Sequence, residues 1–92
     1  MMKEVVNGVM WVGDGKVRLK GVDRIIDCNI EDITAIGINP TDDGKCIFGI
    51  GVVVSNCDFV WRTFICDNEI GLEMFNVLVD ILAFKRGDDN DD

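Results

Sequence analysis

Two periods of apolar residues follow one another along this chain and limit the folds that it can adopt. From residue 16 to residue 66, apolar and polar residues alternate in short runs, as they do in β-strands with one buried face. From residue 69 to residue 82, apolar residues recur every three or four positions, as they do on one side of a helix. Strands followed by a single helix favour an α+β fold over alternating α/β units.

Turn-forming residues divide the alternating part into strands. Gly13-Asp14-Gly15 separates two β-type runs and predicts a hairpin. The stretches 39–44 and 55–58 predict two further loops. We therefore expect an antiparallel β meander or small open barrel of about six strands with one C-terminal helix. Residues 1–86 form a single globular domain in this prediction, and residues 87–92 form an acidic C-terminal tail.

The apolar pattern of the last two strands predicts how they pair. The run from Cys46 to Val54 has large apolar side chains at every second position. If Val54 lies opposite Phe59, nearly all large apolar side chains of both strands share one face. The same register places Phe64 opposite Gly49, where an aromatic ring can cover the glycine backbone.

The C-terminal helix is predicted to begin near Asp67 or Asn68 and to end at Gly87. Its polar residues form one narrow stripe, which consists of Glu69, Glu73, Asn76 and Asp80. The apolar arc is wider than a minimal stripe and leaves two interpretations open. The helix can cap an open barrel, or it can form a homo-oligomer by leaving apolar side chains exposed for a second subunit: Leu72, Val79 or Phe84.

The residue types needed for catalysis or metal binding are scarce. The chain has no His, which is the commonest general base and metal ligand. It has four cysteines but neither a C-x-x-C pair nor a calcium-binding loop. We therefore expect no enzyme activity, no metal and no cofactor. The absence of a recognisable signal peptide or long apolar stretch predicts a cytoplasmic protein with four free thiols, and the predicted register puts Cys46 and Cys66 on opposite faces.

Charge is distributed unevenly along the chain, whose net charge is -8. Residues 1–26 contain five basic and three acidic residues, whereas residues 27–92 contain four basic and fourteen acidic ones. Such an acidic surface disfavours nucleic acid and anionic membranes and attracts basic partners. One interpretation is ordinary solubility. The other is a protein-interaction surface, for which the candidate residues are Asp42, Asp43, Glu69, Glu73 and Asp80.

We accordingly predict a non-enzymatic acidic protein-interaction module. A small acidic domain can imitate the phosphate array of DNA and occupy a basic surface of a nucleic-acid-binding protein. Phage-type inhibitors of host nucleases often act by occupying a target in this way. The expected partner is thus another protein with a basic surface, without direct contact to nucleic acid or a membrane.

The segment 29–36 reads N-I-E-D-I-T-A-I and resembles the I-x-D-I-x-x-I strand pair of pleckstrin-homology (PH) and GRAM-like domains. The resemblance covers residues 16–84 and implies an antiparallel sheet that ends in a helix and binds lipid headgroups, peptides or proteins. A basic pattern on the first hairpin of PH-like domains binds phosphoinositides, and it resembles Lys16, Arg18 and Lys20 here. The alternative function is therefore binding of a lipid headgroup or small anionic ligand. The simpler interpretation is an edge strand whose lysines prevent aggregation.

Overall fold

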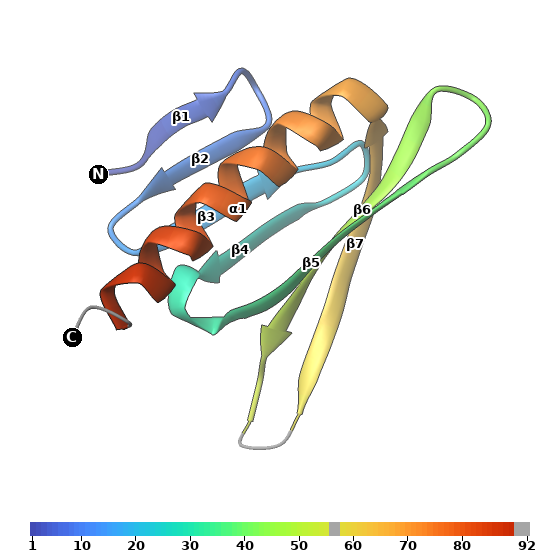
Figure 1. Cartoon of the computed structure of the whole chain (residues 1–92). Coiled ribbons are helices and arrows are strands. Elements are labelled where there is room, and N and C mark those ends of the chain that lie inside the picture. The colour runs from blue at the N-terminus through green and yellow to red at the C-terminus, as the bar shows by residue number, and fades with distance from the viewer. Residues whose placement is uncertain (56–57, 90–92) are drawn as a thin grey trace.

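The computed structural model describes residues 1–55 and 58–89, and within them seven strands form two antiparallel sheets (Figure 1). The first sheet has the order β1 (Lys3–Val6), β2 (Met10–Gly13), β3 (Lys16–Lys20) and β4 (Ile25–Asn29). The second sheet has the order β5 (Ile33–Pro40), β6 (Lys45–Val53) and β7 (Phe59–Asp67). The short 3-10 helix η1 (Ile30–Asp32) links the sheets, and helix α1 spans Asn68–Asp89.

The predicted α+β architecture is confirmed, because antiparallel strands precede one C-terminal helix. The described chain has seven strands instead of about six, since Lys3–Val6 pairs with β2 as an additional edge strand. The sequence K-E-V-V of this strand shows no alternation of apolar and polar residues, and only Val6 is buried. The strands divide into two sheets and form no single closed barrel. Helix α1 continues past Gly87 to Asp89, because one glycine costs a helix only about 1 kcal/mol.

The hydrophobic core lies between the two sheets and helix α1, which contacts β1 of the first sheet and all three strands of the second. Strands β3 and β6 bury alternate side chains as their sequences predict. The fully buried side chains from these strands and from α1 are Val17, Leu19, Cys46, Phe48, Ile50, Met74 and Leu78. Gly71 lets the start of α1 approach the sheet closely, since a Cβ there would lie 2.4 Å from Cys46 Sγ.

Strands β6 and β7 pair one residue away from the predicted register. Val53, rather than Val54, lies opposite Phe59. A shift of one residue exchanges the two faces of a strand. Phe64 therefore points into the core, where it is 4% exposed, and the prediction that it covers Gly49 is wrong. The outward face of β7 instead carries Phe59, Trp61 and Ile65.

The same shift of register corrects the placement of two cysteines. Cys46 and Cys66 lie directly opposite each other and share the buried face, with their Sγ atoms 3.6 Å apart. Both are free thiols, as is Cys28, while Cys57 lies outside the described residues. Burial and the hydrogen bond to Cys46 raise the pKa of the Cys66 thiol to about 12. Such a thiol is a poor nucleophile at neutral pH.

Alkylation of the folded protein should therefore spare Cys66. At pH 8 a thiol with so high a pKa is almost entirely protonated, so iodoacetamide should modify it at least about a hundredfold more slowly than an exposed thiol. Timed alkylation followed by peptide mass spectrometry measures the rate. Unfolding in urea without reductant is the control, and it should make all four thiols reactive. Fast labelling of Cys66 in the folded chain would contradict its burial.

Candidate protein-interaction surface

The side of α1 that faces away from the core carries acidic and apolar side chains in one stripe. Buried Met74 and Leu78 determine which side of the helix faces the sheets. Residues three or four positions apart share a helix face, so the exposed side chains align on the opposite side. The polar members of this α1 stripe are Glu69, Glu73, Asn76 and Asp80. Its apolar members are between 41% and 74% exposed and are Leu72, Val79 and Phe84.

The remaining acidic candidates lie next to the start of the stripe. Asp42 and Asp43 are exposed in the turn between β5 and β6. The backbone N–H of Asn68 donates a 3.0 Å hydrogen bond to the carbonyl of Gly44, which holds this turn against the first residue of α1. The Thr41 hydroxyl donates to the Asp43 carboxylate and lowers its pKa, so that carboxylate stays charged. The structure thus brings Asp42 and Asp43 close to the helix start, whereas Asp80 lies about three turns further along.

An apolar groove of about 280 Å³ borders the stripe on its β5 side. Its walls come from β5 and from α1, and they include Ala35, Ile36, Phe75, Val79 and Leu82. Val79 belongs both to the groove and to the exposed stripe, so the two surfaces are continuous. Sequence reasoning missed this groove because the packing of α1 beside β5 depends on contacts between distant residues. The available signal was the apolar Val79 beside the polar Asp80.

The basic candidates occupy a different sheet. Lys16, Arg18 and Lys20 are all exposed on β3, which lies between β2 and β4. The interpretation of this segment as an edge strand is therefore wrong. The Arg18 Nε donates a 2.8 Å hydrogen bond to Asp27 on the neighbouring strand β4. That ion pair reduces the positive charge that β3 offers to an anion.

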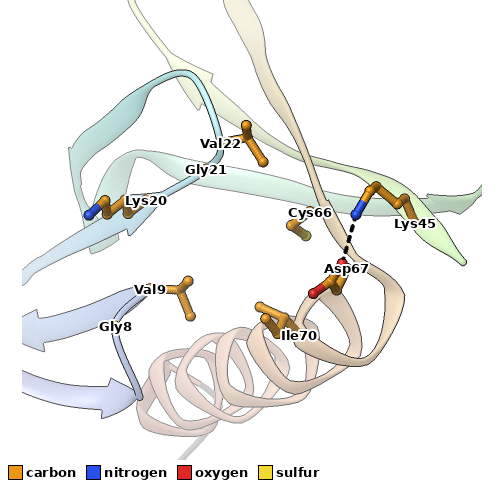
Figure 2. Close-up of a pocket in the computed structure, with 9 residues that line it drawn as sticks. All are labelled: Gly8, Val9, Lys20, Gly21, Val22, Lys45, Cys66, Asp67 and Ile70. Carbon is orange, nitrogen blue, oxygen red and sulfur yellow. Dashed lines mark hydrogen bonds and ion pairs between the residues drawn. The ribbon is translucent and has the colours of Figure 1, made fainter.

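One pocket, also of about 280 Å³, lies between the first sheet and the start of α1 (Figure 2). Lys20 lines it, whereas the other two basic candidates do not. Lys45 lines the other side and donates a 2.9 Å hydrogen bond to Asp67, whose carboxylate raises the pKa of Lys45. Figure 2 shows the ammonium group of Lys20 directed away from this pair. The pocket therefore does not bring the three basic candidates together.

Comparisons with other proteins add no assignment to these surfaces. A scan against protein-family models gives no match, and searches of curated proteins and of solved structures give none either. Among the described residues, no group of three or more Cys, Asp or Glu side chains could hold a metal ion. In the same residues, no helix is long and apolar enough to cross a membrane.

Proposed function

We propose that this chain is a non-enzymatic protein-interaction module whose α1 stripe docks on a basic and partly apolar surface of another protein. The observation that carries this proposal is the composition of the stripe, in which three carboxylates and three exposed apolar side chains share one side of a helix. The carboxylates select a basic partner and steer its approach. The apolar side chains supply the desolvated contacts found at the centre of interfaces.

A nucleic-acid-binding protein is the partner class that we propose. A helix rises about 1.5 Å per residue, so Glu73 lies about 6 Å from Glu69 along the axis and Asp80 about 10.5 Å from Glu73. These intervals are close to two and three times the rise along the helix axis of about 3.4 Å per phosphate of one DNA strand. The turn with Asp42 and Asp43 extends the acidic row beyond Glu69. This spacing supports a phage-type inhibitor that occupies a phosphate-binding groove.

We place this interaction in the cytoplasm and assign no catalytic role to the chain. The free thiols of Cys28, Cys46 and Cys66 support the location, because thiols stay reduced in that compartment. The absence of His from the whole sequence supports a non-catalytic role, since a nucleophilic serine or cysteine needs a neighbouring base.

Reversing the charges of the stripe should weaken partner binding. We expect the triple variant Glu69→Lys, Glu73→Lys, Asp80→Lys to bind its partner at least about tenfold more weakly, because like charges would then meet across the contact. Affinity capture from the native host with quantitative mass spectrometry measures the difference between the variant and the wild type. Binding of the wild type should itself decrease as salt rises, since screening shortens the reach of exposed charges.

Deletion of residues 88–92 is the matched control for this variant. It removes four acidic residues from the chain end and leaves every charge of the stripe in place. We expect the truncated chain to retain most of the partner binding. Equal losses from the truncation and the triple variant, or the same captured proteins with wild type and triple variant, would contradict a docking role of the stripe.

The exposed basic residues of β3 support a second candidate function, the binding of a lipid headgroup or small anionic ligand that the PH-like resemblance implies. In its favour, Lys20 borders the pocket of Figure 2. Pelleting with phosphoinositide-containing vesicles tests it, with the triple variant Lys16→Ala, Arg18→Ala, Lys20→Ala beside the wild type. Vesicle binding that is lost in this variant, while reversal of the acidic stripe has no effect, would replace the first proposal.

A further inference from the structure

The outward face of the β5–β6–β7 sheet is apolar and uncovered by any described part of the chain. Its five large apolar side chains are between 38% and 50% exposed: Ile47 and Val53 on β6, and Phe59, Trp61 and Ile65 on β7. Helix α1 packs against the opposite face, where Gly71 meets Cys46. We call this surface the outer face. Contiguous apolar surface of this kind marks an interaction site.

Glycines lie beneath the aromatic rings of the outer face. A Cβ on Gly49 would lie 3.5 Å from the Trp61 ring, and one on Gly51 would lie 3.0 Å from the Phe59 ring. The two rings also meet edge to face, with their centroids 6.0 Å apart. Rings that lie along the backbone do not project far from the sheet, and packed sheet faces lie about 10 Å apart.

The outer face carries no net charge, although the whole chain has a net charge of -8. Among the described residues of the three strands, the charged side chains in register with this face are Lys45 and Asp67, at the end that borders the pocket of Figure 2. They form a 2.9 Å ion pair with each other. A basic partner attracted by the acidic stripe would therefore gain no charge complementarity here. An uncharged apolar surface can be complementary to itself, as a two-fold contact requires.

We infer that the outer face binds the same face of a second copy of this chain. Its five side chains leave roughly 450 Å² exposed, given full areas of about 150–250 Å² for each aromatic one. A face-to-face pair would then bury about 900 Å², close to the roughly 1,000 Å² at which specific interfaces begin, so the dimer is reversible. Each α1 lies on the far side of its own sheet. The two acidic stripes therefore stay further apart than the screening length of about 8 Å.

Sedimentation equilibrium of the full chain at increasing concentration tests this inference. We expect a monomer–dimer equilibrium that Ile65→Lys weakens at least about tenfold, because each interface would bury unpaired ammonium groups. The matched controls are Leu72→Lys and Val79→Lys on the α1 stripe, where the exposed fractions are 47% and 41%. These controls should leave the equilibrium unchanged. Higher salt should preserve or strengthen the dimer, in contrast to binding of a basic partner.

A second variant keeps the test decisive if Ile65→Lys disturbs folding. Val53→Lys changes the other end of the outer face, and circular dichroism with urea unfolding shows which variants retain the fold. Weakening by either folded variant supports the inference. A monomer at all concentrations would overturn it. A dimer that persists in both outer-face variants would overturn it too. If Leu72→Lys disrupts a dimer that the outer-face variants leave intact, the contact between the two copies lies on α1 instead.

Discussion

Replacing Phe64 with alanine is expected to lower the free energy of unfolding by about 3–5 kcal/mol, the range for a fully buried phenylalanine. The ring is 4% exposed and stacks on Phe48 with a centroid distance of 5.6 Å. It also lies against the backbone of Gly21, where an added Cβ would be 2.5 Å from Phe64 Cγ. The substitution would therefore leave a cavity between β6, β7 and the β3–β4 connection. Urea unfolding at equilibrium measures the loss.

Phe84→Ala is the matched control for this prediction, since Phe84 is 74% exposed on α1. We expect it to change the free energy of unfolding by no more than about 0.5 kcal/mol. The predicted register, with Phe64 over Gly49, implies a smaller loss of about 1–3 kcal/mol for Phe64→Ala than the observed burial does. Similar losses for the two phenylalanine variants would contradict the register of β6 and β7.

Gly71→Ala should destabilise the protein by about 1–3 kcal/mol, although alanine favours a helix over glycine by about 1 kcal/mol. The new Cβ would lie 2.4 Å from Cys46 Sγ and 3.0 Å from Ile38 Cδ1, so α1 would have to move away from the sheet. Thermal or urea unfolding measures the change. At a helix position without such a close contact, replacing glycine with alanine should stabilise the fold.

Two comparisons make the Gly71 prediction specific. Asn76→Ala, on the exposed side of the same helix, should cost less than Gly71→Ala because no packing is disturbed. Combining Gly71→Ala with Cys46→Ala should cost less than the sum of the two single changes, because the smaller side chain makes room for the new methyl group. A stabilising effect of Gly71→Ala alone would show that α1 does not lie this close to β6.

The architecture was predictable because the two apolar periods identify strands and helix without knowledge of tertiary contacts. The strand β1 was missed because Val6 is its only buried residue, so its four residues show no alternation. The register of β7 was missed because both of its faces are apolar. Phe59, Trp61 and Ile65 share one face and Phe64 and Cys66 the other, and alternation alone does not choose between them. The outward-facing glycines of β6 explain the observed register, since the aromatic rings of β7 can lie over them.

For the candidate surface, the grouping of the helix residues was predictable, whereas the neighbours of the helix were not. The helical period places Glu69, Glu73 and Asp80 in one stripe whatever the sheet looks like. The neighbourhood of Asp42, Asp43 and the helix start was not readable, because it depends on the hydrogen bond between Asn68 and Gly44. The groove beside Val79 likewise depends on how α1 packs against β5.

Photo-crosslinking from the stripe tests its docking role most directly. A photoreactive amino acid replaces Asn76 at the centre of the stripe in one protein, and Arg18 on the outward side of β3 in another. In the native host, we predict a discrete protein adduct from position 76 and none from position 18. Reversal of the charges at Glu69, Glu73 and Asp80 should abolish that adduct. An adduct from position 18 alone, or one from position 76 that survives the charge reversal, would contradict docking through the acidic stripe.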